Sequence, residues 1–178
     1  MTEPVRNLLV TGRPGVGKTT LIERVLEQLA VDTGGFYTRE ILKDGTRVGF
    51  SIAGLNGRTG VLAHVDLASP FRVGKYGVNR DDLERVGVTA IDEALGGAAL
   101  IVMDEIGRME LCSPAFQDAV VRALDSHTPV LGTLQDRKND FLDSVRARPD
   151  VSVVRVNSGN RECLVPVLRD EILELLGK

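Results

Sequence analysis

The first part of the chain shows two different patterns of apolar residues. Residues 7–11 form a short, mainly apolar run, which predicts a buried β-strand. After a glycine-rich turn, apolar residues recur every three or four positions, which is the period of one face of an α-helix. These residues are Leu21, Ile22, Val25, Leu26 and Leu29. We therefore expect a strand, a tight turn and an amphipathic helix, in that order.

Between Gly34 and His64 the pattern changes to short runs rich in β-branched and aromatic residues. Two hairpin-turn signals, Lys43-Asp44-Gly45 and Asn56-Gly57, separate these runs. The runs are Phe36–Thr38, Val48–Ile52 and Val61–Ala63. This segment predicts a small antiparallel β insertion after the first helix.

Helical and strand patterns alternate through the rest of the chain. Asp81–Leu95 has a helical pattern that Gly87 weakens, which predicts one interrupted helix or two short ones. Ser113-Pro114 suits the N-cap and first residue of a further helix. Such alternation favours a three-layer α/β architecture with a mostly parallel sheet. The expected strands are Ala99–Met103, Pro129–Thr133 and Val151–Val156, and the closing helix has Leu164, Leu168, Ile172 and Leu175 on its apolar face.

Composition narrows the class of protein. Of the 178 residues, 43% are hydrophobic and no repeat or linker divides them, so we expect a single domain over residues 1–178. The net charge of −3 gives no support for general nucleic-acid binding. The longest uncharged apolar stretch, Ala94–Met103, is much shorter than the roughly 20 residues that cross a bilayer. Cys112 and Cys163 lack metal-site spacing, so no zinc site is expected and the cytoplasm is the expected compartment.

The segment from Gly12 to Thr19 matches the complete G-x-x-x-x-G-K-[ST] pattern of a phosphate-binding loop. Glycines let successive backbone N–H groups approach phosphate oxygens, and the helix that follows directs its positive end at them. Lys18 supplies a cation for the β- and γ-phosphates, and the Thr19 hydroxyl is a ligand for Mg²⁺. The predicted nucleotide-binding residues here are Gly12, Arg13, Pro14, Gly15, Val16, Gly17, Lys18, Thr19 and Thr20.

A second candidate segment follows the apolar run that ends at Met103. A carboxylate at the end of a buried strand is what the magnesium side of such a site needs, so Asp104 is the expected Mg²⁺ ligand, through water. Glu105 is the predicted acceptor of a proton from an attacking water, with a plain loop start as the alternative. Thr133 ends the next strand along the chain, where its hydroxyl either orients water at the γ-phosphate or has no catalytic role.

Asp104–Gly107 also matches the D-x-x-G pattern of GTPases, in which the Gly107 N–H would contact the γ-phosphate. The sequence has no guanine-reading Asn-Lys-x-Asp motif, and Arg137–Asp140 has these residue types in the wrong order. A dedicated GTPase is therefore disfavoured.

Several cationic residues are candidates to stabilise the charge that develops in phosphoryl transfer. Each of them is more often a solvated surface charge. They are Arg39, Arg72, Lys75, Arg108 and Arg137. Asn160-Arg161 is expected either to border the nucleobase or to cap a helix.

Taken together, these motifs resemble the small P-loop nucleoside-triphosphatase family that includes the cancer-related NTPase of animals. The string Asp104-Glu105-Ile106-Gly107-Arg108-Met109-Glu110-Leu111 is more specific to it than the phosphate loop. Shorter matches occur in order over nearly the whole chain, at Gly35–Thr38, Val48–Phe50, Arg72–Tyr76, Gly132-Thr133 and Asn160-Arg161. Leu134–Asn139 departs from the family pattern, so no lid contact of Arg137 or Lys138 is carried over.

The resemblance implies a three-layer P-loop NTPase fold. It further implies slow, Mg²⁺-dependent hydrolysis of several nucleoside triphosphates, ATP and GTP among them, to diphosphate and phosphate with a loose base preference. It also marks a second nucleotide-binding segment, Leu100, Ile101, Val102, Met103, Asp104, Glu105, Ile106 and Gly107. The adjacent acids themselves favour the P-loop class in which the strand at Val130–Thr133 lies between the first strand and the carboxylate strand.

Two other functions stay open at this point. A kinase would transfer the γ-phosphate to a nucleotide, nucleoside or nucleic-acid end, with Gly34–His64 holding the acceptor. A nucleotide-dependent switch would bind a protein partner that the sequence does not identify. Glu105 beside Asp104 favours hydrolysis, because hydrolysis needs a base for water whereas transfer needs water excluded. A local basic patch around Arg72–Arg80 keeps nucleic acid open as a partner despite the net charge.

Overall fold

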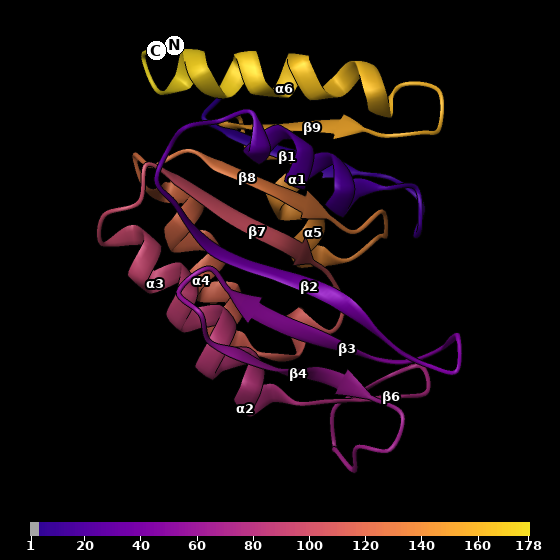
Figure 1. Ribbon diagram of the computed structural model, residues 1–178. Helices are drawn as coiled ribbons and strands as arrows, with labels where there is room; N and C mark the ends of the chain where they lie inside the picture. Colours follow the sequence, from indigo (N-terminus) through magenta and orange to yellow (C-terminus); the bar gives the residue numbers. More distant parts are fainter. Residues whose placement is uncertain (1–3) are drawn as a thin grey trace.

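The structure is a computed structural model that describes residues 4–178, so residues 1–3 of the expected domain lie outside it. Its strands form one nine-stranded sheet in the order β5-β6-β4-β3-β2-β7-β8-β1-β9. Helices cover both faces of this sheet (Figure 1). The predicted three-layer α/β architecture is therefore confirmed.

Parallel strands form the half of the sheet that ends at β9. They are β2 (Thr33–Lys43), β7 (Leu100–Ile106), β8 (Val130–Leu134), β1 (Asn7–Thr11) and β9 (Val151–Arg155). Both β1 and β8 are buried along their whole length, which explains their apolar runs without alternation. The strand β7 continues beyond the expected end at Met103, so Asp104 and Glu105 lie within it.

Antiparallel strands extend the sheet on the other side of β2. They are β3 (Thr46–Gly54), β4 (Thr59–His64), β6 (Tyr76–Val78) and β5 (Arg72–Val73). Because β2 pairs with both β7 and β3, the predicted insertion is continuous with the main sheet and larger than expected. The β2–β3 turn has positive φ at Asp44 (50°) and Gly45 (76°), as a two-residue hairpin turn requires.

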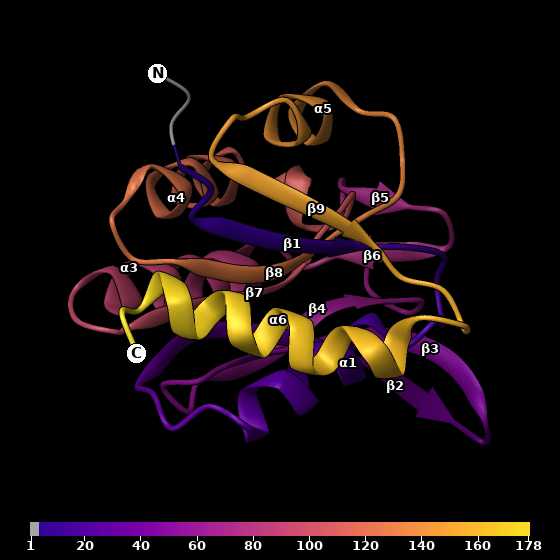
Figure 2. The ribbon, with the colours of Figure 1, turned by 90° about the horizontal axis from the view of Figure 1, so that it is seen from above.

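The helices form two layers with a separate apolar core on each face of the sheet (Figure 2). One face is covered by α1 (Lys18–Glu27) and α6 (Arg161–Leu175). The other face is covered by α3 (Thr89–Leu95), α4 (Pro114–Asp125) and α5 (Asp140–Arg146). Shorter helical segments are α2 (Arg80–Asp82), η1 (Leu83–Val88) and η2 (Glu110–Cys112). Within residues 4–178, every helix is too short or too polar to cross a membrane.

Several local signals act as the sequence predicts. The Ser113 hydroxyl accepts a hydrogen bond from the Phe116 N–H at 3.1 Å and so caps α4, with Pro114 at the first helical position. The weakened helix around Gly87 is the run of α2, the π-helical η1 and α3. The helix α5 was not expected, although Asn139 caps it by accepting from two backbone N–H groups.

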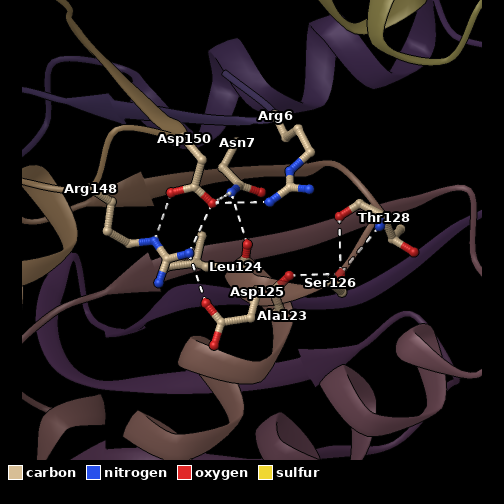
Figure 3. A network of polar contacts seen from close by, with 9 residues as sticks. All are labelled: Arg6, Asn7, Ala123, Leu124, Asp125, Ser126, Thr128, Arg148 and Asp150. Atoms are coloured by element: carbon tan, nitrogen blue, oxygen red, sulfur yellow. Dashed lines mark hydrogen bonds and ion pairs between the residues drawn. The ribbon is translucent and has the colours of Figure 1, made fainter. Parts of the chain in front are cut away.

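A network of polar contacts joins the amino ends of β1 and β9 to the end of α4 (Figure 3). Its centre is the buried Asp150, whose carboxylate accepts from Arg148 at 2.9 and 2.8 Å and from the Asn7 amide at 3.2 Å. Arg6 lies 3.6 Å from the same carboxylate, and Asn7 also donates to the Leu124 carbonyl. These contacts lie at the edge opposite the phosphate-binding loop, because that loop follows the carboxyl end of β1.

Candidate active site

The sheet order brings the predicted site segments to one edge. The strand β8 lies between β1 and β7, as the adjacent acids predicted. The carboxyl ends of these parallel strands meet at that edge, which is the usual ligand edge of such sheets. The phosphate-binding loop therefore follows β1, and Asp104 stands two strands away on β7, with Thr133 on the strand between them.

The phosphate-binding loop has the backbone that its glycines permit. Gly15 and Gly17 have φ of 76° and 100°, a region that favours glycine. A Cβ on Gly12 would lie 2.7 Å from the Val156 carbonyl oxygen, so a larger residue does not fit there. Within the described residues, α1 has no side-chain cap and no acid in its first turn, so its first N–H groups are free for an anion.

Lys18 folds back over this loop. Its Nζ donates to the carbonyl oxygens of Gly12 and Arg13, both at 3.2 Å. The ammonium group of Lys18 therefore contacts the backbone of the same loop that is predicted to bind phosphate. Weak backbone contacts hold it there, and a triphosphate would replace them with stronger charge-assisted hydrogen bonds.

Asp104 and Thr133 form a buried pair across β7 and β8. The Thr133 hydroxyl donates to Asp104 Oδ1 at 2.6 Å, although 29 residues separate the two in sequence. The other carboxylate oxygen, Oδ2, is buried without a hydrogen-bond partner in the part of the chain that the structure describes. Burial raises the pKa of Asp104, against the lowering effect of the Thr133 and Thr19 hydroxyls and of Lys18.

The unpartnered oxygen of Asp104 bears on whether a cation fits beside this carboxylate. A buried carboxylate oxygen without a donor is stabilised by a cation. Thr19 lies close enough to lower the pKa of the same carboxyl group. Residues 4–178 contain no cluster of three or more His, Cys, Asp or Glu side chains suited to a metal. Mg²⁺ in phosphate-loop sites does not need such a cluster, because phosphate oxygens and water complete its ligands. Thr19 and Asp104 therefore fit Mg²⁺.

Two further carboxyl groups lie beside Asp104. Burial raises the pKa of Glu105, against the lowering effect of Lys18, and the charge of Asp104 raises it further. Glu110 is 4% exposed, and burial together with the charge of Glu105 raises its pKa to about 8. Sequence reasoning gave Glu110 no role, and its place in the Met-Glu-Leu string was the available signal. Burial and mutual repulsion among the three carboxyl groups therefore favour their protonated forms, which Lys18 opposes at Asp104 and Glu105.

The strand β2 adds residues that the sequence did not assign. Tyr37 pairs in register with Asp104 on β7, and burial and the charges of Glu23 and Asp104 raise its pKa to about 12. Arg39, one of the candidate cations, follows on the same strand and forms an ion pair with Glu23 of α1. Arg39 is therefore near the site but is held by a carboxylate.

The other candidate cations lie elsewhere or contact the site differently. Arg72 and Lys75 flank the β5–β6 turn, where Arg72 donates to the Lys75 carbonyl at 2.8 Å. In the sheet order four strands lie between β5 and β7, which corresponds to about 24 Å at ordinary strand spacing. The Arg108 backbone N–H donates to Gln135 Oε1 at 3.0 Å, which ties Gly107-Arg108 to the end of β8.

Asn160 and Arg161 lie next to the phosphate-binding loop. Asn160 makes no capping hydrogen bond to α6 within the described chain, and its amide instead donates to the Arg155 carbonyl at 3.0 Å. The Arg161 guanidinium reaches the Val16 carbonyl at 3.5 Å. The helix cap was one of the two expectations for this pair, and the Asn160 side chain does not form it.

Comparison with known proteins gives this geometry a context. The family model described as NTPase matches residues 7–172. The nucleoside-triphosphatase THEP1 of Thermotoga sp. (strain RQ2) is 46% identical over 95% of this chain and 94% of its own length. The crystal structure of THEP1 from the hyperthermophile Aquifex aeolicus has a TM-score of 0.83 at 31% identity, covering 97% of this chain and 99% of that one.

The solution structure of a human cancer-related nucleoside triphosphatase is also similar. It has a TM-score of 0.80 at 35% identity and covers 96% of this chain and 98% of that chain. These similarities confirm the three-layer P-loop NTPase fold and the resemblance found in the sequence. The chain belongs to the NTPase family, a family of nucleoside-triphosphatase enzymes.

Proposed function

We propose that this protein hydrolyses nucleoside 5′-triphosphates, ATP and GTP among them, to the diphosphate and phosphate. The observation that carries the proposal is the buried Asp104–Thr133 pair, with its unpartnered carboxylate oxygen, at the strand edge that also carries Lys18. The similar proteins bear hydrolase names, so the kinase that the sequence left open is not favoured.

Each predicted residue has a role in this proposal. The N–H groups of Gly12–Thr20 and the ammonium group of Lys18 bind the β- and γ-phosphates. Thr19 and Asp104 hold Mg²⁺, which when bound neutralises charge on the phosphate oxygens. Glu105 accepts the proton of the attacking water, and its raised pKa suits a general base. Thr133 fixes Asp104 through its hydroxyl, and Leu100–Gly107 forms the second wall of the site.

Slow turnover is part of the proposal. An arginine that reaches the transferred phosphoryl group raises the rate by about 10³–10⁵ in related chemistry. Arg39 is the candidate cation beside the site, and Glu23 holds it in an ion pair. We therefore expect a turnover below roughly 10 per second, the median for enzymes.

The proposal also covers the whole chain. The NTPase model spans residues 7–172, and one continuous sheet joins the first and last strands of the fold, which supports a single domain over residues 1–178. The cytoplasm remains the expected compartment.

Product analysis tests the proposed reaction. The protein is incubated with ATP, GTP, CTP or UTP, with Mg²⁺ or with a chelator, and the nucleotide products and free phosphate are quantified. We expect equal amounts of diphosphate and phosphate from all four substrates with Mg²⁺, and none with the chelator. Monophosphate and pyrophosphate, or release from a single nucleotide, would contradict the proposal.

A further inference from the structure

The first residue after β8, Gln135, lies where the ends of three parallel strands meet. In the sheet order, β8 is placed between β1, which leads into the phosphate-binding loop, and β7, which carries the two adjacent acids. The Thr11 hydroxyl donates to the Leu134 carbonyl at 2.7 Å and so ties the end of β8 to the end of β1. Gln135 therefore lies between the loop that contains Lys18 and the turn that follows β7.

Gln135 is held by its backbone and by one end of its side chain. Its backbone N–H donates to the Ile106 carbonyl at 3.0 Å, and its own carbonyl accepts from the Arg146 guanidinium group at 2.5 Å. Its side-chain Oε1 accepts from the Arg108 N–H at 3.0 Å. Because only the oxygen of a side-chain amide accepts hydrogen bonds, this contact fixes the orientation of the amide. The two N–H groups of the amide remain as donors for a ligand.

Two neighbouring donors are already engaged within the protein. The Thr133 hydroxyl has a single proton, which it donates to Asp104. The Gly107 N–H is hydrogen-bonded to the Glu110 carboxyl group, and a Cβ built on Gly107 would lie 3.2 Å from Glu110 Oε2. These two groups therefore have no proton to donate to a ligand, whereas the Gln135 amide has two.

The ligand group that suits this position is the γ-phosphate of a nucleoside triphosphate. In the proposed reaction the attacking water lies between the γ-phosphate and Glu105, and Lys18 contacts the same phosphate. The γ-phosphate therefore lies between the phosphate-binding loop and the end of β7, and β8 is the strand between them. An amide N–H that donates to a charged phosphate oxygen makes a charge-assisted hydrogen bond, which is stronger than a neutral one. A diphosphate lacks this partner.

Resting on the proposed function, we propose that the Gln135 amide donates a hydrogen bond to the γ-phosphate and thereby distinguishes the triphosphate substrate from its diphosphate product. The same side chain holds the Arg108 N–H, so it links the γ-phosphate to the turn that follows Glu105. A donor fixed in advance suits this role, because it needs no rearrangement when the ligand binds. Gln135 belongs to the stretch Leu134–Asn139 that departs from the family pattern, so the contact is assigned to this chain alone.

Equilibrium binding tests this assignment without reading hydrolysis. Dissociation constants for ADP and for the non-hydrolysable triphosphate AMP-PNP are measured with Mg²⁺ by calorimetry on the wild type, Gln135→Met and Gln135→Glu. Gln135→Met removes the donors and the acceptor at similar length, whereas Gln135→Glu keeps an acceptor for the Arg108 N–H and removes the donors. Gln117→Met is the matched control, because Gln117 also braces the turn after β7, by donating to the Leu111 carbonyl at 2.9 Å.

We expect both Gln135 variants to bind AMP-PNP at least about tenfold more weakly than the wild type, the size of one hydrogen bond to a charged group, and to bind ADP within about twofold of it. Gln117→Met is expected to bind both ligands as the wild type does. The assignment is overturned if Gln135→Met loses no more affinity for AMP-PNP than for ADP, if Gln135→Glu binds AMP-PNP as tightly as the wild type, or if Gln117→Met weakens AMP-PNP equally. Because hydrolysis is not measured, the proposed function can fail independently of this result.

Discussion

At the scale of single residues, the hydrogen bond from Thr133 to Asp104 organises the carboxylate that faces the phosphate-binding loop. We expect Thr133→Val, which removes the hydroxyl at nearly constant shape, to deprive Asp104 Oδ1 of its hydrogen-bond donor inside the protein. The free energy of unfolding is expected to fall by about 1–3 kcal/mol, and the Mg²⁺ concentration for half-maximal phosphate release to rise. Urea unfolding and a Mg²⁺ titration measure these effects.

Thr133→Ser is the matched variant, because it keeps the hydroxyl. It is expected to retain most of the stability and the Mg²⁺ response of the wild type. If the serine and valine variants behave alike, the hydroxyl does not position Asp104.

Glu110 gives a prediction about pH. Its carboxyl group has a pKa of about 8 in the folded chain against an ordinary value of 4.5, because it is buried near Glu105. Between these values the unfolded chain releases the proton and the folded chain keeps it, so stability falls as pH rises from about 4.5 to 8. Glu110→Gln removes this loss. Relative to the wild type, it is therefore expected to gain at least about 1 kcal/mol between pH 5 and pH 8.5.

Urea unfolding at the two pH values, without nucleotide or metal, measures this difference. The exposed Glu174 on α6 provides the control, and Glu174→Gln is expected to show the same stability relative to the wild type at both values. If the stability of Glu110→Gln relative to the wild type is also the same at both pH values, Glu110 ionises freely in the folded chain.

At this scale the sequence predicted the residues whose roles depend on a local motif. The loop from Gly12 to Thr19 is continuous in sequence, so its pattern predicted the turn between β1 and α1. The pattern placed Asp104 just after its strand, whereas the structure places it within β7. Glu110 and the Tyr37–Asp104 pairing depend on burial and register between distant segments, which no local pattern contains.

At the scale of elements, the Asp150 network holds β1, β9 and α4 together at the edge away from the site. Asp150 is 1% exposed at its side chain, and Arg148, its main partner, is 24% exposed. We expect Asp150→Asn to reduce the free energy of unfolding by about 3 kcal/mol, because it removes the charge partner of the partly buried Arg6 and leaves Arg148 with Asp125 alone. Phosphate release is expected to stay within about twofold of the wild type, because stability alone is affected.

The pH dependence of this effect has a definite sign. Hydrogen bonds from Arg148 hold the pKa of Asp150 below its ordinary value, against the effect of burial. The stabilisation is therefore present at neutral pH and is lost as pH falls through the lowered pKa. The stability difference between the wild type and Asp150→Asn should shrink in acid. A difference that grows in acid would contradict the ion-pair explanation.

Most elements followed from apolar periodicity and caps, and the exceptions have physical reasons. The helix α5 has only Leu142 and Val145 as buried residues, too few for a periodic signal. The strands β5 and β6 are two and three residues long and lack a pattern of their own; β6 is held by pairing with β4, and β5 by pairing with β6. The strand β7 extends beyond its run of apolar residues because Asp104 is buried and accepts a hydrogen bond from Thr133 on β8.

At the scale of the whole molecule, one sheet joins the parallel half that carries the site to the antiparallel half built from β3 to β6. The position of β8 between β1 and β7 was predicted from the chemistry of two adjacent acids rather than from packing. The size of the antiparallel half was underestimated, because β2 pairs on both sides and its length is set by tertiary contacts. The proposed hydrolytic site lies at the central part of this sheet, where β1, β8 and β7 end.

The most direct test of the account compares the wild type with Glu105→Gln. Phosphate release from ATP and the dissociation constant for ATP are measured in parallel with Mg²⁺, and Glu174→Gln serves as the control. Removing a general base is expected to lower the rate of release by about 10²–10⁴, with ATP affinity within about threefold of the wild type. Phosphate release that persists in Glu105→Gln at the wild-type rate would contradict the assignment of Glu105 as the base and, with it, the mechanism derived from this site.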